Sequence, residues 1–232
     1  MKKYKLHKGI LVAIEGIDGT GKTTQTIKLR DYFIQKGVPT VSFKEPTDGK
    51  FGQEIKRLSK YGRDTVTPQE EFEIFLQDRI EDCNNNITPS LEHKKLVLMD
   101  RYYFSNIAYQ SVLGLSSDYI EQRNKEIAPP PDLVIILDVA AKISLSRILH
   151  FRKEQHNHFE REDYLDKVRE AFRGMKHSYI QIVDGSPDED TVFSHLKNIV
   201  NDLIVPFAVE DVSQIDLFAK GWPTEDTVYH NN

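Results

Sequence analysis

The eight residues Gly16-Ile17-Asp18-Gly19-Thr20-Gly21-Lys22-Thr23 say more about this chain than any other stretch. They match the pattern G-x-x-x-x-G-K-[ST] at every fixed position. An apolar run at residues 10–14 precedes them and helix-forming residues 25–32 follow, which predicts a strand, a tight loop and a helix. Glycines let such a loop curl until several backbone N–H groups point at one phosphate, and the helix adds the positive end of its dipole. The pattern predicts a site for a nucleoside triphosphate.

Two side chains of this loop have predictable tasks. Lys22 can reach the outer phosphates, and the hydroxyl of Thr23 can bind Mg²⁺. The alternative interpretation is an ordinary glycine-rich turn before a helix. We expect the ATP contacts to come from Gly16, Ile17, Asp18, Gly19, Thr20, Gly21, Lys22, Thr23 and Thr24.

Short apolar runs alternate with longer helical patterns along the rest of the chain. Strands separated by helices imply right-handed crossovers and a parallel sheet. We therefore predict a three-layer α/β fold of the P-loop NTPase type, with a five-stranded parallel sheet and helices on both faces. The predicted strands are residues 10–15, 40–43, 96–99, 133–137 and 180–183. The predicted helices are residues 22–35, 68–84, 104–113, 141–151, 163–177 and 192–203.

Polar residues follow the second and third predicted strands, and parallel sheets bind ligands at the carboxyl ends of their strands. After the third strand, Asp100 is placed to hold a magnesium ion and Arg101 to clamp a phosphoryl group. A salt bridge that ends the strand is the alternative for this pair. The helix that follows carries a polar face suited to a nucleoside, made of Ser105, Asn106, Tyr109 and Gln110.

Composition narrows the class of protein. The chain has 232 residues, enough for one domain, and 39% of them are hydrophobic, enough for a core. A net charge of −5 argues against non-specific nucleic-acid binding. Cys83 is the only cysteine, which excludes a disulfide framework, and no apolar stretch is long enough to span a membrane. We expect a cytoplasmic protein that binds neither membranes nor nucleic acid.

These motifs, taken together, resemble the thymidylate (dTMP) kinases, a family of P-loop nucleoside monophosphate kinases. The resemblance covers about residues 8 to 205, and the most specific part is the run D-R-Y-x-x-S-x-x-A-Y-Q. The matching stretches are residues 14–25, Glu45-Pro46-Thr47, Phe75-Leu76-Gln77-Asp78-Arg79, residues 100–110 and Leu137-Asp138-Val139.

The resemblance implies transfer of a phosphoryl group from ATP, with Mg²⁺ at Thr23 and Asp100, to dTMP. Lys22, Asp100 and Arg101 would be catalytic. Arg101 would hold the acceptor phosphate, and Asp18 would accept a hydrogen bond from the sugar 3′-hydroxyl. Lys44, Glu45, Ser105 and Gln110 complete the expected acceptor contacts.

The resemblance also implies how the acceptor base and sugar are held. Phe75 would stack on the thymine ring, Arg79 would donate to a thymine carbonyl, and Asn106 would contact the base edge. Tyr109 would crowd the sugar 2′ position and favour deoxyribose. Core packing beside Phe72 and Leu76 is the alternative for Phe75.

A basic, poorly patterned segment at about residues 147–161 resembles the lid of these kinases. One subgroup of the family carries an arginine in its phosphate loop, whereas the other supplies arginines from the lid. Here the loop position is Gly19, so we expect Arg147 and Arg152 to act from the lid, with Lys153 and Arg161 as further candidates.

The remaining expectations concern organisation and alternatives. Residues 1–208 would form one domain and 209–232 a tail of unknown role, and the family resemblance implies a homodimer. The chain has Lys44 where the family commonly has arginine, and lysine lacks bidentate geometry. Three alternatives stay open: a deoxynucleoside kinase, a kinase of another pyrimidine nucleotide such as dUMP, and a regulatory switch that binds a nucleoside triphosphate without phosphorylating an acceptor.

Overall fold

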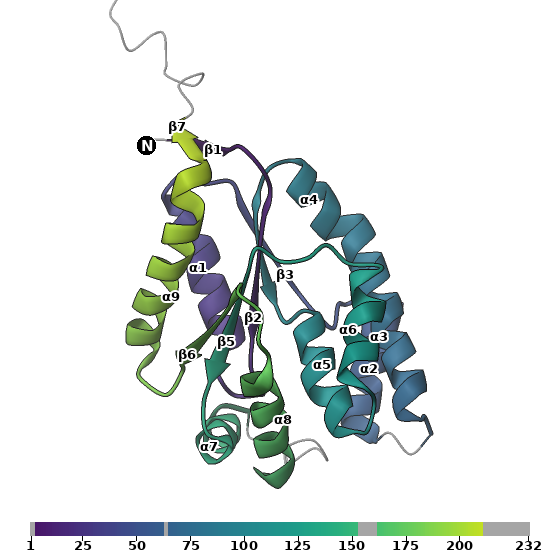
Figure 1. Cartoon of the computed structure of the whole chain (residues 1–232). Coiled ribbons are helices and arrows are strands. Elements are labelled where there is room, and N and C mark those ends of the chain that lie inside the picture. Colours follow the sequence, from purple (N-terminus) through teal and green to yellow (C-terminus); the bar gives the residue numbers. More distant parts are fainter. Residues whose placement is uncertain (1–2, 63–64, 153–161, 211–232) are drawn as a thin grey trace, which may run out of the picture.

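The computed structural model describes residues 3–62, 65–152 and 162–210, and of residues 150–152 the backbone only. At its centre lies the predicted five-stranded sheet, in the order β3-β4-β2-β5-β6 with every neighbouring pair parallel (Figure 1). Each strand begins at the predicted residue and ends within one residue of the predicted end. The strands are β2 (Ile10–Glu15), β3 (Thr40–Lys44), β4 (Leu96–Asp100), β5 (Leu133–Asp138) and β6 (Ile180–Asp184).

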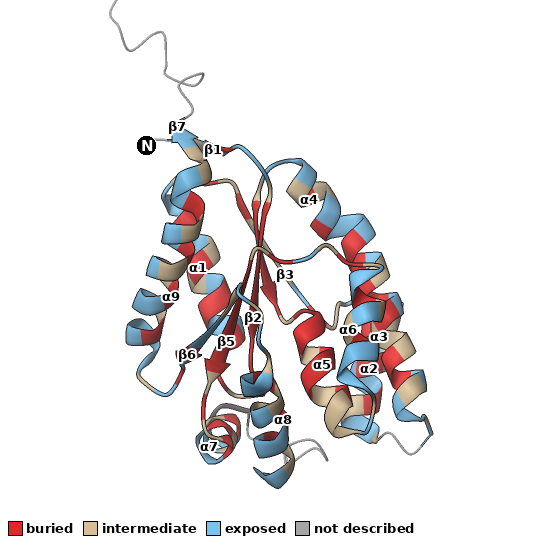
Figure 2. Ribbon diagram, viewed as in Figure 1, coloured by how far each residue is buried: buried red, intermediate tan, exposed pale blue. Residues whose placement is uncertain are grey.

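Hydrophobic cores lie on both faces of this sheet, and β2 contributes to each. Ile10, Val12 and Ile14 belong to one core, whereas Leu11 and Ala13 belong to the other. Successive side chains of a strand point to opposite faces, so a central strand covered on both sides is apolar throughout. Figure 2 shows the resulting buried centre. Helices α1 (Lys22–Gln35) and α9 (Glu189–Ile204) cover the first face, and α5 (Tyr103–Val112) and α8 (Glu162–Gly174) lie over the second.

Helix α3 (Pro68–Asp82) is shorter than predicted and changes its geometry at its end. A π-helical turn, Cys83–Ile87, follows it and leads into α4 (Thr88–Glu92). Pro89 explains the change, because proline has no N–H and its ring collides with the carbonyl four residues earlier. The helical ladder therefore widens before it, and the backbone N–H of Thr88 donates to the carbonyl of Cys83 five residues back.

Several elements escaped the sequence prediction. Helices α2 (Lys50–Tyr61) and α6 (Ser117–Lys125) pack beside α3 and α5. A short antiparallel ribbon joins β1 (Tyr4–Leu6) to β7 (Ala208–Glu210).

This ribbon corrects the predicted domain boundary. We assigned residues 209 and 210 to the tail, but their pairing with β1 makes them part of the fold. Residues 211–232 lie outside the described residues.

The lid prediction falls partly outside the described residues. Its first part is the end of α7 (Ala141–Arg152), which begins where predicted and ends one residue later. Residues 153–161, with Lys153 and Arg161, are not described. None of the described helices combines the length and the apolar character needed to cross a membrane.

Candidate active site

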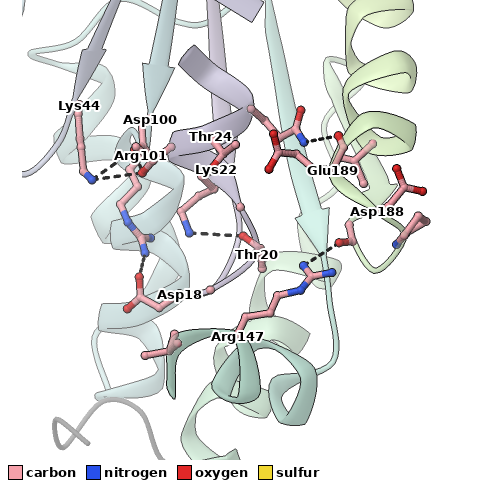
Figure 3. A pocket seen from close by; sticks show the side chains of 18 residues that line it. Asp18, Thr20, Lys22, Thr24, Lys44, Asp100, Arg101, Arg147, Asp188 and Glu189 are labelled. Atoms are coloured by element: carbon pink, nitrogen blue, oxygen red, sulfur yellow. Dashed lines mark hydrogen bonds and ion pairs between the residues drawn. The ribbon is translucent and has the colours of Figure 1, made fainter. Parts of the chain in front are cut away.

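A cleft of about 470 Å³ opens at the carboxyl edge of the sheet. Its walls come from the loop after β2, the first turn of α1, the ends of β3 and β4, helix α7 and the loop between β6 and α9. Figure 3 shows Lys22, Lys44, Arg101 and Arg147 around it. Residues that the sequence separates by more than a hundred positions are therefore gathered where a parallel sheet binds its ligands.

The loop after β2 depends on glycine at two close approaches. A Cβ on Gly16, whose φ is +135°, would lie 2.6 Å from the carbonyl oxygen of Leu137. A Cβ on Gly19, whose φ is +81°, would lie 2.4 Å from the carbonyl oxygen of Ser144 in α7. Only glycine adopts these positive φ angles without strain and leaves this room. The second contact also means that α7 packs directly on the loop.

Helix α1 begins at this loop with its N-terminus open. Its first residue follows Gly21, which has no side chain to cap the helix, so its first N–H groups face the cleft. Such a helix end attracts anions through its free donors and its dipole. Loop and helix together form a site for phosphate.

Lys22 lies buried beneath the loop. Its Nζ donates to the carbonyl of Ile17 at 2.6 Å and to Oγ1 of Thr20 at 3.5 Å. Burial, together with the nearby charge of Arg101, lowers the pKa of Lys22 to about 7, although Asp18 and Asp100 oppose the shift. An anion bound beside Lys22 would raise this pKa again, because it favours the charged form.

Thr23 and Asp100, the two predicted magnesium ligands, lie together at the ends of α1 and β4. Oγ1 of Thr23 donates to Oδ2 of Asp100 at 2.5 Å. Nζ of Lys44 lies 3.4 Å from the same carboxylate oxygen and 3.3 Å from the threonine hydroxyl. Hydroxyl and carboxylate oxygens are ligands that Mg²⁺ accepts. The described residues hold no group of three His, Cys, Asp or Glu that could bind a metal, so Mg²⁺ here would also need phosphate and water oxygens.

Arg101 is the most constrained cation of the cleft. Its φ is +73°, a conformation that residues other than glycine rarely adopt. Its guanidinium forms an ion pair with Asp18, donates to Oγ of Ser105 at 2.9 Å, and lies 5.4 Å from the ring centre of Tyr109. Burial is the largest single influence on Arg101 and opposes its charge. The neighbouring Asp18, Tyr109, Glu15 and Asp100 together outweigh burial and raise the pKa of Arg101. This arginine therefore stays charged and fixed in place.

A second predicted group, expected to hold the acceptor base, meets around Arg79. This side chain is only 1% exposed and forms a forked ion pair with Glu45, with Nε 3.2 Å from Oε1. Its Nη1 donates to Oδ1 of Asn106 at 2.5 Å and to Oδ1 of Asn124. Nδ2 of Asn106 in turn donates to Oε1 of Gln110 at 3.2 Å. The described contacts use four of the five N–H donors of the guanidinium.

The two predicted aromatic contacts of the acceptor are Phe75 in α3 and Tyr109 in α5. In α3, Phe72 is fully buried and Leu76 is 2% exposed, whereas Phe75 between them is only partly buried. Core packing therefore uses its neighbours rather than Phe75. Tyr109 makes edge contacts with Tyr164 and Phe172 of α8, with ring centres 6.4 and 6.3 Å away.

Arg147, expected to act from the lid, contacts the loop after β6. Its guanidinium donates to the carbonyls of Gly185 and Ser186, both at 2.9 Å. Arg147 lines the cleft from the side opposite Arg101. The side chain of Arg152 lies outside the described residues.

Three residues of this region were not predicted as site residues. Asn124 of α6 binds Arg79. Asp138, at the end of β5, forms a forked ion pair with Arg169 of α8, with Nε–Oδ1 and Nη2–Oδ2 distances of 2.5 and 3.0 Å. Glu15 is fully buried at the end of β2 and receives hydrogen bonds from the start of α5. A charged residue that ends an otherwise apolar strand was the signal for Glu15.

Fold and site define a class of protein. In this chain β2, at the centre of a parallel sheet, leads into a phosphate loop, and the neighbouring strand β4 ends at an acid followed by an arginine. This is the arrangement of P-loop NTPases, in which the loop holds the phosphates and the acid lies on the side of the Mg²⁺.

Comparison with known proteins narrows this class to one family. The family model for thymidylate kinase matches residues 14–196. A probable thymidylate kinase from Archaeoglobus fulgidus is 40% identical over 84% of this chain and 96% of its own length. The thymidylate kinase of Desulfotalea psychrophila is 40% identical over 79% and 90%, and that of Xanthomonas campestris pv. campestris (strain B100) is 37% identical over 83% of each chain. The chain belongs to the thymidylate kinase family, and it is a nucleotide-binding phosphotransferase.

Proposed function

We propose that this chain transfers the γ-phosphoryl group of ATP to dTMP, giving dTDP and ADP. Family membership supports this reaction. The position of Arg101 is the observation that carries the proposal: its guanidinium lies between Asp18 of the phosphate loop and Tyr109 of α5. The same helix turns Asn106 toward Arg79. A fixed cation between a donor site and an acceptor site stabilises the charge on a phosphoryl group in transfer.

On the donor side, the open N–H groups of the loop and of α1 would hold the ATP phosphates. Lys22 would exchange the carbonyl of Ile17 for a phosphate oxygen, which favours its charged form. Thr23 and Asp100 would hold Mg²⁺, which when bound neutralises charge on the phosphate oxygens. Lys44, 3.4 Å from Asp100, would be displaced from that carboxylate and become free to meet the acceptor phosphate.

On the acceptor side, Glu45, Asn106 and Asn124 hold Arg79 rigidly and leave one N–H donor for the base. We infer that this donor meets a pyrimidine carbonyl. Cytosine has an amino group where thymine has a carbonyl, so a donor would face a donor and binding would weaken. Phe75 would stack on the ring.

Two further expectations belong to the same proposal. Arg147, with Arg152, would complete the charge clamp from the lid side when ATP is bound. We also expect a homodimer, as the family resemblance implies, and a cytoplasmic enzyme, since Cys83 is a free, buried thiol.

The test is turnover with a panel of acceptors. Purified protein, ATP and Mg²⁺ are mixed with dTMP, dUMP, dCMP, UMP or thymidine, and ADP release is followed. We expect selective turnover of dTMP. Among the deoxynucleotides, dCMP should be the poorest acceptor, because its amino group would face an N–H donor of Arg79. Preferred use of thymidine or of another monophosphate would refute the assigned acceptor. ATP binding without acceptor-dependent ADP would favour a regulatory switch.

A further inference from the structure

Glu15 is a buried carboxylate to which the phosphate-transfer proposal gives no role. It is the last residue of β2, directly before the first glycine of the phosphate loop, and is fully inaccessible to solvent. Burial raises the pKa of Glu15, against the hydrogen bond from Ser105 and the charge of Arg101. A carboxylate kept in so dry a place must be satisfied by fixed partners.

Those partners all belong to the start of α5. Oε1 of Glu15 accepts from the backbone N–H of Tyr102 at 2.7 Å and from that of Ser105 at 3.2 Å. Oε2 accepts from the hydroxyl of Ser105 at 2.6 Å. The residue that precedes α5, Tyr102, provides no side-chain cap. Glu15 therefore caps helix α5 from the end of β2, and its negative charge lies at the positive end of the helix dipole.

The cap holds the backbone on one side of Arg101. On the other side, the N–H of Arg101 itself donates to the carbonyl of Ile14 at 3.0 Å. Two successive residues of β2 thus anchor the backbone here: Ile14 accepts from the N–H of Arg101, and Glu15 accepts from the N–H of Tyr102. A positive φ at a residue other than glycine persists only where its surroundings enforce it, and these two anchors do so.

The cap also reaches the guanidinium of Arg101. The hydroxyl of Ser105 donates to Oε2 of Glu15 and accepts from Nη1 of Arg101 at 2.9 Å. Because a hydroxyl has one proton, its donation to the carboxylate leaves its lone pairs turned toward the arginine. Glu15 thereby orients the acceptor that Ser105 presents to Arg101.

We propose that Glu15 is a positioning residue that sets both the backbone and the guanidinium of Arg101 for the acceptor phosphate. This inference rests on the proposed function, in which Arg101 binds that phosphate. We call the chain of hydrogen bonds from Glu15 through the Ser105 hydroxyl to Arg101 the relay. In this inference the hydroxyl of Ser105 connects Glu15 to Arg101.

Steady-state kinetics of Glu15→Gln test the proposal, because glutamine keeps the shape and one oxygen acceptor but loses the charge. We expect kcat/KM for dTMP to fall about tenfold, the scale of one charge-assisted hydrogen bond. We expect the KM for ATP to change less than about twofold. Ser105→Ala, which breaks the relay but leaves the cap at Tyr102, is expected to show the same split and serves as the second variant if Glu15→Gln does not fold.

A double-mutant cycle separates positioning from general support of the fold. If Glu15 acts through Arg101, its substitution should cost less than about twofold in an Arg101→Ala background. Asp132→Asn is the matched control, since Asp132 accepts from the backbone N–H of Leu11 at 2.9 Å near the other end of β2. It should lower the melting temperature without changing either KM.

Three results would overturn the proposal. The first is a loss of kcat/KM that is equal for dTMP and for ATP in Glu15→Gln. The second is a double-mutant cycle in which the losses from Glu15→Gln and Arg101→Ala simply add. The third is a variant that melts at a lower temperature but keeps the wild-type kinetic constants. A crystal structure of Glu15→Gln reads the geometry without any turnover: Arg101 should leave its φ of +73° or lose Ser105, and an unchanged Arg101 would refute the inference. If wild-type protein fails to phosphorylate dTMP, the proposed function fails, but this structure still tests the role of Glu15.

Discussion

Gly19 offers a quantitative test of the packing between the phosphate loop and α7. In Gly19→Ala, the new Cβ would stand 2.4 Å from the carbonyl oxygen of Ser144, whereas ordinary contacts begin at 3.4 Å. Helix α7 must therefore retreat by about 1 Å. The positive φ costs about 1–2 kcal/mol for alanine, and forced overpacking costs about 1–3 kcal/mol more.

Gly114→Ala isolates the first of these terms. Gly114 has a φ of +99°, and a Cβ there would meet nothing within 4 Å. The two variants should share the backbone strain and differ by about 2 kcal/mol of steric cost. For a chain of this size that difference corresponds to about 4–8 °C in melting temperature, which differential scanning calorimetry measures.

Activity provides the second readout. Because α7 carries Arg147 on the wall of the cleft, its retreat should reduce kcat/KM for ATP by roughly tenfold to a hundredfold, whereas Gly114→Ala should leave it unchanged. If Gly19→Ala has the same melting temperature as Gly114→Ala and the wild-type kcat/KM for ATP, then α7 does not pack on the loop as described.

The other predictions concern the two buried cations. Lys22→Ala should lower kcat by orders of magnitude in the ADP-release assay while melting no lower than wild type, because it removes a buried charge; full activity would contradict the mechanism. Arg79→Ala should raise the KM for dTMP far more than that for ATP, and equal losses would make Arg79 purely structural. Because the pKa of Lys22 is lowered to about 7 in the fold, the unfolded chain binds more protons above that pH, so stability should rise from about pH 7 toward 10.5 and flatten in Lys22→Met. ATP binding at pH 8 should take up a proton at Lys22, which calorimetry in buffers of different ionisation enthalpy detects; no uptake would mean that the lysine does not meet the phosphates.

Much of the architecture could be predicted because the information is local. The phosphate loop and all five strands of the sheet were found from short apolar runs and glycine spacing, since a strand buried on both faces is apolar along its length. Helix α2 was missed although Phe51, Ile55 and Leu58 repeat at helical spacing. Gly52 is there for packing: a Cβ would stand 2.2 Å from the carbonyl oxygen of Thr47.

Other features depend on contacts that no local pattern contains. Helix α6 buries only Ile120 and Asn124, so it shows no apolar stripe. The hydrogen bond between Arg79 and Asn124 spans 45 positions, and the one between Glu15 and the N–H of Tyr102 spans 87. Such partners become visible only when the fold has brought the elements together.

The ribbon of β1 and β7 has a consequence for how the chain is made. A protein leaves the ribosome N-terminus first, so β1 emerges well before its partner strand, which ends at Glu210. Leu6, 3% exposed in the finished fold, belongs to the same core as Phe33 and Leu196. The ribbon therefore cannot form until synthesis has passed residue 210, by which point every residue of the sheet and of α9 has been made.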